Sequence, residues 1–195
     1  IFYSSAFLQS VFSRYNDVVA FYIKHHPVIG ILSFLGLAAL SVMLGPFTSI
    51  PLVPPAITAW GVGDTFLFLF VGWLLGDTLA FVVGRFVGYP LVAKIMGKVS
   101  LDESLATLQK RLSFLLLFLF RLATPSETGY VFGILKYSFK KYLLITAIVE
   151  LPFATLAVYA SDALLEAGWQ QFIAYILIWV VIILLAIYEF RKRFK

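Results

Sequence analysis

The sequence carries no charged residue between Pro27 and Gly63, and this apolar stretch is too long for one membrane-spanning helix. As a helix it would extend roughly 55 Å, whereas the hydrocarbon core of a bilayer is about 30 Å thick. Proline removes a backbone donor and clashes with a continuing helix, so the chain is expected to turn where prolines gather. These residues are Pro46, Pro51, Pro54 and Pro55. We therefore predict a re-entrant segment over residues 46–63, with Pro51, Pro54 and Pro55 at its tip.

Composition indicates an integral membrane protein. Of the 195 residues, 62% are hydrophobic and only 13% are charged, against about 25% in a soluble domain. There are no cysteines and only two histidines, which excludes disulfide scaffolds and thiol nucleophiles and supplies few metal ligands. Since no nucleophile–base pair or metal-ligand pattern is present, we expect no enzyme activity, no metal and no cofactor.

A second apolar segment, residues 111–136, is interrupted in a similar way. Arg111 and Arg121 are separated by about 15 Å of helix, which is half a bilayer, and Pro125 follows. Lys136 closes the segment after an arm of similar length. We predict a second re-entrant segment with Pro125 at its tip. Two interrupted segments in corresponding halves of a chain are typical of transporters with a site near the bilayer midplane.

The remaining segments complete an all-α polytopic fold. Residues 1–26 read as an interfacial helix, residues 27–168 as the membrane domain, and residues 169–195 as a last spanning helix with a basic tail. Within the membrane domain we predict spanning helices over residues 28–44, 64–86 and 142–161, with Asp64 as the N-cap of the second. A re-entrant hairpin followed by a transmembrane helix thus occurs twice, in opposed orientations, with flanking helices.

The positions of Lys and Arg orient this path. With a cytoplasmic N-terminus, all of the 15 Lys and Arg except Arg85 and Arg121 fall inside, whereas Asp64, Asp162 and Glu166 fall outside. The positive-inside rule favours this arrangement, which also explains the net charge of +5 without nucleic acid. We predict a protein of a bacterial or archaeal plasma membrane with both termini in the cytoplasm.

Four ionisable residues fall at membrane depth: Asp77, Arg121, Glu127 and Glu150. A charge at this depth is costly unless it is paired or hydrated, so each is a functional candidate. Arg121 and the amides of the hairpin tips would bind a lipid phosphate. The three carboxyl groups would carry a proton or balance a cationic headgroup. The alternative is a structural ion pair of Arg121 with Glu127 or Asp77.

Four glycines lie at multiples of four residues on one predicted helix. They are Gly72, Gly76, Gly84 and Gly88, and this pattern predicts close packing against neighbouring helices.

Three motifs resemble the DedA family, also called the VTT or SNARE-associated domain. Gly72-Trp73-Leu74-Leu75-Gly76-Asp77-Thr78, followed by Gly84-Arg85-Phe86-Val87-Gly88, resembles its GxxxGD and GRxxG block. Phe120-Arg121-Leu122 with Pro125 resembles the hairpin signature, and residues 133–142 resemble its continuation. The similarity covers residues 46–167.

The resemblance implies two opposed re-entrant hairpins and a role in flipping or scrambling phospholipids and polyprenyl-phosphate carriers, often with dependence on the proton-motive force. By position, Asp77 matches the family's GD aspartate and Arg121 its hairpin arginine. The sequence departs from the family where Pro54-Pro55-Ala56 replaces an acidic position and where Glu127 replaces a second arginine. Glu127 or Glu150 would then have to supply the coupling acid.

Together these features predict a flippase or scramblase that moves phospholipid or polyprenyl-phosphate headgroups between leaflets, with proton coupling. Its expected partners are these lipids, protons and a second copy in a homo-oligomer, but not nucleic acid. The alternative is a proton-coupled small-ion or small-solute antiporter of the same architecture. A lateral opening between helices would favour lipid, whereas a sealed aqueous vestibule would favour solute.

Overall fold

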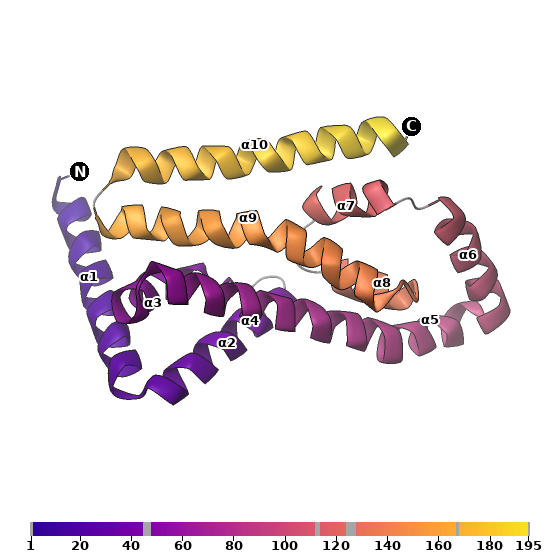
Figure 1. Cartoon of the computed structure of the whole chain (residues 1–195), viewed down its shortest axis with the longest axis horizontal. Helices are drawn as coiled ribbons and strands as arrows, with labels where there is room; N and C mark the ends of the chain where they lie inside the picture. The colour runs from indigo at the N-terminus through magenta and orange to yellow at the C-terminus, as the bar shows by residue number, and fades with distance from the viewer. Residues whose placement is uncertain (1, 45–47, 112–113, 124–127, 167, 195) are drawn as a thin grey trace.

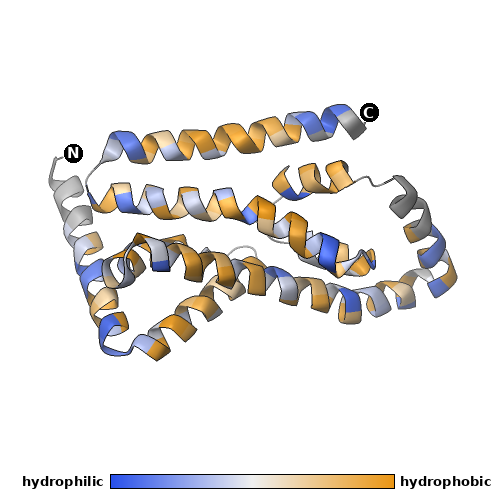
Figure 2. Cartoon of the chain, in the orientation of Figure 1, coloured by the Kyte–Doolittle hydropathy of each residue, from blue (hydrophilic) through white to orange (hydrophobic). Residues whose placement is uncertain are grey.

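The computed structural model describes residues 2–44, 48–111, 114–123, 128–166 and 168–194, which are helical apart from short connections (Figure 1). No strand occurs among these residues. Four helical stretches are long and apolar enough to cross a membrane: Pro27–Leu44, Val62–Ile95, Phe139–Leu165 and Trp169–Glu189. Figure 2 shows hydrophobic residues along the middle of α10 (Trp169–Phe194) and hydrophilic residues at both of its ends. The predicted all-α polytopic membrane protein is therefore confirmed.

The N-terminal helix α1 (Phe2–His25) packs across the start of the membrane domain. Tyr15 Oη donates to the Pro51 carbonyl at 3.3 Å, and Asn16 Nδ2 donates to Thr58 Oγ1 at 3.1 Å. Phe21, on its other side, is exposed. A helix with one packed and one exposed apolar side suits the membrane surface, but that location of α1 stays a prediction.

Helices α2 (Pro27–Leu44) and α3 (Val53–Trp60), joined through η1 (Ile50–Leu52), form a helical hairpin that we call hairpin 1. At its open end, the Phe34 and Trp60 ring centroids lie 5.5 Å apart. Near its closed end, Ser41 Oγ donates to Ser49 Oγ at 3.3 Å, and Trp73 Nε1 of the next helix donates to the same Ser49 oxygen at 3.0 Å.

The prolines of hairpin 1 lie where they do not disturb a helix. Pro54 and Pro55 are buried in the first turn of α3, whose backbone N–H groups have no partner within the helix, and Pro51 is exposed in η1. Pro46 lies outside the described residues.

Hairpin 1 corrects the predicted path of the chain. The sequence predicted that residues 28–44 cross the membrane before a separate re-entrant segment, which would put Lys24 and Asp64 on opposite sides. Helix α2 is long and apolar enough to cross, and that crossing stays a prediction. The 8-residue α3, which packs against α1, α4 and α9, nevertheless brings the chain back to the end of the bundle where α2 begins. The rings of Phe34, Trp60 and Phe68 are in contact, so the start of α2 and the start of α4 lie at one end of the bundle. Lys24 and Asp64 therefore share that end. The re-entrant position of the hairpin in a membrane stays a prediction.

The N-cap of helix α4 (Val62–Val83) is Gly61, so the prediction of Asp64 as its N-cap was wrong. Gly61 has φ +84°, a left-handed conformation that glycine adopts without steric cost, and it turns the chain from α3 into α4. Asp64 lies in the first turn, where the helix dipole favours a carboxylate. A π-helical turn, Gly84–Gly88, then leads into α5 (Tyr89–Met96).

After α6 (Lys98–Arg111), helices α7 (Phe114–Ala123) and α8 (Thr128–Ile134) form the second hairpin, hairpin 2. The ring centroids of Phe120 and Phe132, one from each arm, lie 6.4 Å apart. Residues 124–127, which join the arms and include Pro125 and Glu127, lie outside the described residues.

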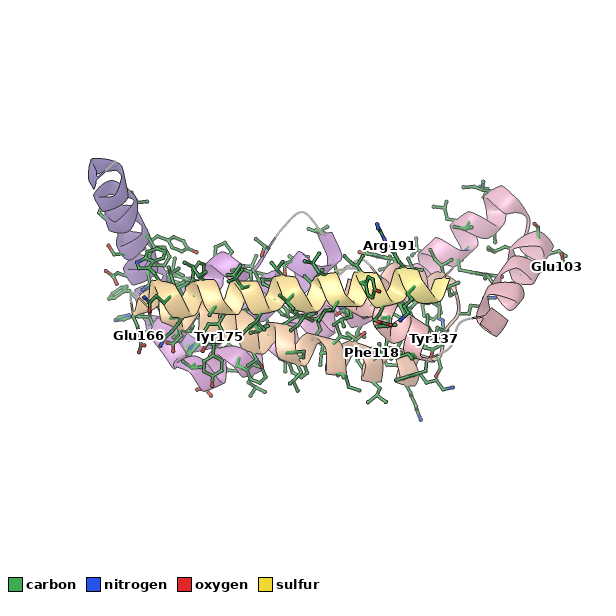
Figure 3. All side chains as sticks on the ribbon, turned by 90° about the horizontal axis from the view of Figure 1, so that it is seen from above. Glu103, Phe118, Tyr137, Glu166, Tyr175 and Arg191 are labelled. Carbon is green, nitrogen blue, oxygen red and sulfur yellow. The ribbon has the colours of Figure 1, made fainter. Side chains whose placement is uncertain are left out.

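Helix α9 (Phe139–Leu165) follows hairpin 2 and packs against α4, and α10 packs against α7 and α9. Figure 3 shows Glu166 and Tyr175 toward one end of the bundle and Tyr137 and Arg191 toward the other. The N-terminal helix and the C-terminus also lie at opposite ends (Figure 1). A hairpin followed by a long helix thus occurs twice along the chain.

The α5–α6 arm is fastened to the turn after hairpin 2 by three polar side chains. Tyr89 Oη donates to Asp102 Oδ1 at 2.7 Å, and Lys136 Nζ lies 3.5 Å from the same oxygen. Lys136 Nζ also lies 3.6 Å from the centroid of the Tyr89 ring. The hydrogen bond from Tyr89, assisted by the charge of Lys136, lowers the pKa of Asp102 below its usual value of 3.8.

Replacing Tyr89 by phenylalanine should return the pKa of Asp102 toward 3.8, as an NMR titration of carboxyl-¹³C-labelled aspartate would show. Because the folded-state pKa is the lower one, Asp102 contributes stability above the unfolded pKa of about 4 and loses it as the pH falls through the folded value. Tyr159→Phe, on the distant α9, is the control and should leave this titration unchanged. An unchanged Asp102 titration in Tyr89→Phe would contradict the assignment.

Candidate functional site

Three charged side chains from three helices meet inside the bundle. Arg121 Nη2 lies 2.9 Å from Asp77 Oδ2 and also donates to Glu150 Oε1. Asp77 is fully buried, Arg121 is 2% exposed and Glu150 is 7% exposed. We call these residues the charge cluster. It joins the two halves of the chain, because α4 belongs to the first half and both α7 and α9 to the second.

Each residue of the charge cluster lies next to a feature that ends its helix, breaks its hydrogen bonding or lets it pack closely on another helix. Arg121 lies in the last turn of α7, next to the tip of hairpin 2. Asp77 follows Gly76, whose missing side chain lets α4 approach α2. Glu150 precedes Pro152, which removes one backbone donor from the middle of α9.

The tips of the two hairpins meet beside the cluster. Tyr130 Oη, from the start of α8, donates to the Met43 carbonyl near the end of α2 at 2.9 Å. Thr128 Oγ1, at the start of α8, is buried without a hydrogen-bond partner among the described residues. The site is therefore enclosed by both hairpins, and it contains polar groups that packing alone does not require.

Tyr142 completes the site, although the sequence analysis did not select it. Its hydroxyl lies 3.1 Å from both Asp77 Oδ1 and the Asp77 carbonyl, and its side chain is fully buried. The signal was present in the spacing, because Tyr142, Thr146 and Glu150 occur at four-residue intervals and so share one face of α9.

Removing the Tyr142 hydroxyl by Tyr142→Phe should lower the free energy of unfolding by roughly 1–2 kcal/mol, because a buried carboxylate loses a donor. Chemical denaturation of the purified protein in detergent would measure the change. Tyr188→Phe alters an exposed tyrosine of α10 and should have no measurable effect. Equal effects from the two substitutions would show that the hydroxyl is not needed by Asp77.

Glycines bring the helices of the site close together. A Cβ at Gly72 would lie 2.7 Å from Ala38 Cβ, and one at Gly76 would lie 2.8 Å from Val42 Cβ, so both face α2. Four further glycines, at the contact between α8 and the α4–α5 segment, also allow a close approach: Gly84, Gly88, Gly129 and Gly133. The sequence analysis selected Gly72, Gly76, Gly84 and Gly88 but missed Gly129 and Gly133, because the arms of the second hairpin were not seen as packing surfaces.

Gly129 has a direct role in the geometry of the charge cluster. A Cβ there would lie 2.9 Å from Tyr142 Oη and 3.0 Å from the Asp77 carbonyl. A larger residue would therefore separate the hydroxyl from its acceptors.

The structure brings together three of the four predicted membrane-depth charges: Asp77, Arg121 and Glu150. The ion pair of Arg121 with Asp77, which the sequence analysis gave as the structural alternative, is present. Glu127 lies outside the described residues, and Pro51, Pro54 and Pro55 belong to hairpin 1 rather than to the cluster. Among the described residues there is no group of three or more His, Asp or Glu side chains that could hold a metal ion.

Comparison with known proteins connects this geometry to a family. Neither the curated proteins nor the solved structures include a significant match to the chain. The profile of the VTT domain matches residues 36–163, well over half of the chain. The matched region begins within α2 and ends within α9, so it contains hairpin 2, most of hairpin 1 and the whole charge cluster. The chain therefore belongs to the VTT domain family, the DedA family.

Proposed function

We propose that this protein moves the phosphate-bearing headgroups of phospholipids or polyprenyl phosphates between membrane leaflets, as a proton-linked flippase or scramblase. The observation that carries the proposal is the charge cluster, buried where the tips of two helical hairpins meet inside an apolar bundle. Broken helices that meet around a polar site are typical of secondary transporters. Membership of the VTT domain family supports a transport-related role.

The composition of the cluster suggests how a proton and a phosphate would be linked. One guanidinium faces two carboxyl groups, so the cluster is neutral when one carboxyl group carries a proton. A buried uncompensated charge costs several kcal/mol, which strongly favours neutrality. A lipid phosphate that binds Arg121 would displace Asp77 or Glu150. The displaced carboxyl group would then take up a proton, and release it when the phosphate leaves.

The charge distribution orients the protein in our proposal. The end of the bundle that carries Lys140, Lys141 and the basic C-terminal tail faces the cytoplasm, following the positive-inside rule. The C-terminus is then cytoplasmic. Because α1 lies at the other end of the bundle, we place it at the outer face, in contrast to the prediction from the sequence. We keep the bacterial or archaeal plasma membrane as the proposed location.

A leaflet-exchange assay on the purified full chain in liposomes tests the function. It uses fluorescent phospholipid and polyprenyl-phosphate probes, with and without a pH gradient. We expect exchange above that of protein-free vesicles, and a rate that responds to the gradient. Absence of exchange for every lipid, together with proton-linked uptake of a small ion or solute, would instead favour the antiporter.

Glu150→Gln tests the proton link in the same assay. The substitution keeps the size of the side chain but removes a titratable group, so exchange should no longer respond to the pH gradient. Glu166→Gln, at an exposed position after α9, is the matched control and should retain the response. A full response in Glu150→Gln would assign proton coupling to another residue.

A further inference from the structure

A cavity of about 560 Å³ lies at the open end of hairpin 2, outside the charge cluster. Its wall is formed by the first residue of α7, the turn between α8 and α9, and the first two turns of α9. The side chains that matter for its chemistry are Phe114, Lys136, Tyr137, Ser138, Lys141 and Leu144. The volume lies within the range of small-molecule sites, about 300–1,000 Å³.

The polar part of the wall is suited to an anion. Lys136 and Lys141 both line the cavity, and the ammonium of Lys136 also contacts Asp102. None of the described residues that line the cavity is acidic. Ser138 is the N-cap of α9 but makes no side-chain capping hydrogen bond, so its hydroxyl remains available. The first-turn N–H groups of α9 lie next to it and add to the positive potential. Three kinds of donor therefore converge on one space.

The apolar part of the wall indicates that the anion belongs to a lipid. Phe114 is 49% exposed and Leu144 is 55% exposed, so both present hydrocarbon on the outer surface of the bundle. A free phosphate ion would gain nothing from these side chains. An acyl chain would cover them while the phosphate reaches the lysines.

Lys136 is held in an unusual backbone conformation. Its φ is +52°, and it is the one residue other than glycine with positive φ in the described part of the chain. Hydrogen bonds from Lys136 N to the Gly133 carbonyl at 3.0 Å and from Tyr137 N to the Phe132 carbonyl at 3.1 Å hold the turn. Strain of this kind persists where surrounding structure imposes it and often marks functional sites.

From these observations we infer that the cavity binds the phosphate of an anionic membrane lipid, with Lys136 and Lys141 as phosphate ligands and Phe114 and Leu144 against the acyl chain. The inference rests on the proposed function, because the cavity would load lipid from the cytoplasmic leaflet before it reaches the charge cluster. Lys136 also lies 3.5 Å from Asp102, so a bound phosphate would compete with that carboxylate.

Lipid binding to the full chain in detergent, measured by native mass spectrometry, tests the inference. The probes are dioctanoyl phosphatidic acid, dioctanoylglycerol, which has the same tails without phosphate, and inorganic phosphate. We expect the phosphatidic acid to bind in preference to the other two. Lys141→Gln should weaken its binding about tenfold, the effect of losing one charge-assisted hydrogen bond. Lys140→Gln removes the neighbouring charge, which does not line the cavity, and should change binding by less than about twofold.

Three results would overturn the inference. They are equal weakening by Lys140→Gln and Lys141→Gln, equal binding of phosphatidic acid and dioctanoylglycerol, and displacement of phosphatidic acid by an equal concentration of inorganic phosphate. Leaflet exchange separates this failure from failure of the proposed function. Phosphatidic acid binding without exchange would leave the docking site standing and remove the transport proposal. Exchange without Lys141-dependent binding would leave the transport proposal standing and remove the docking site.

Discussion

Arg121→Ala should lower the free energy of unfolding by about 3–5 kcal/mol and abolish lipid exchange. The guanidinium is 2% exposed and contacts both Asp77 and Glu150. Its removal leaves two buried carboxyl groups without a cation, and breaking a buried pair in this way is much more costly than replacing all of its charges together. Denaturant titration in detergent, followed by the fluorescence of the four tryptophans, would measure the loss.

Two further variants make this result specific to the cluster. Arg191→Ala removes an exposed arginine of α10 and should change stability by less than about 0.5 kcal/mol. Adding Asp77→Asn and Glu150→Gln to Arg121→Ala removes the orphaned charges and should recover most of the lost stability, although not the exchange. If Arg121→Ala were as stable as Arg191→Ala, the three side chains would not be paired in the folded protein.

The sequence was sufficient to predict the class of fold and to identify each residue of the charge cluster as a candidate. A charge-free stretch longer than a membrane helix requires a turn, and ionisable residues at membrane depth require partners. The pair of Arg121 with Asp77 was predicted only as one of two alternatives, and the contact with Glu150 was not predicted, because Arg121 is 44 residues from Asp77 and 29 from Glu150 in the chain. Which of several acids meets a buried arginine depends on how the helices pack.

The errors in hairpin 1 have a similar origin. Prolines mark where a helix stops, but they do not say which neighbour the next helix packs against. The 8-residue α3 packs against α1, α4 and α9, so the chain returns to the end of the bundle where α2 begins and Asp64 lies at the same end as Lys24. Gly61 was overlooked as the N-cap of α4 because an aspartate three residues later matched a common N-cap type.

Tyr142 and Gly129 were missed because their roles depend on one another. A tyrosine in an apolar helix is unremarkable until a glycine on a facing helix leaves room for its hydroxyl beside Asp77. Short hairpin arms such as α8 also give too little sequence to show a packing face. Contacts of this kind come from the assembled bundle and not from any one segment.

Gly84→Ala should be the most damaging single added methyl group among the glycines predicted to pack, lowering the free energy of unfolding by about 3 kcal/mol. The new Cβ would lie 2.8 Å from both the carbonyl carbon and the Cα of Tyr130. These are backbone atoms, which cannot rotate away as a flexible side chain can, so α8 would have to move off α4. Because Tyr130 joins the two hairpin tips and Gly129 admits the Tyr142 hydroxyl, this displacement should also weaken the charge cluster.

The matched control for Gly84→Ala is Gly36→Ala on α2, where an added Cβ would meet nothing within 4 Å. Alanine is the better helix former by about 1 kcal/mol, so this substitution should leave stability unchanged or raise it. The same denaturant titration measures both variants. A loss in Gly84→Ala alone would locate the close contact between α4 and α8, whereas equal small changes would mean that α8 does not pack there. Gly84 lies two helical turns from Asp77. If the folded Gly84→Ala variant also lost lipid exchange, transport would depend on how hairpin 2 packs against α4.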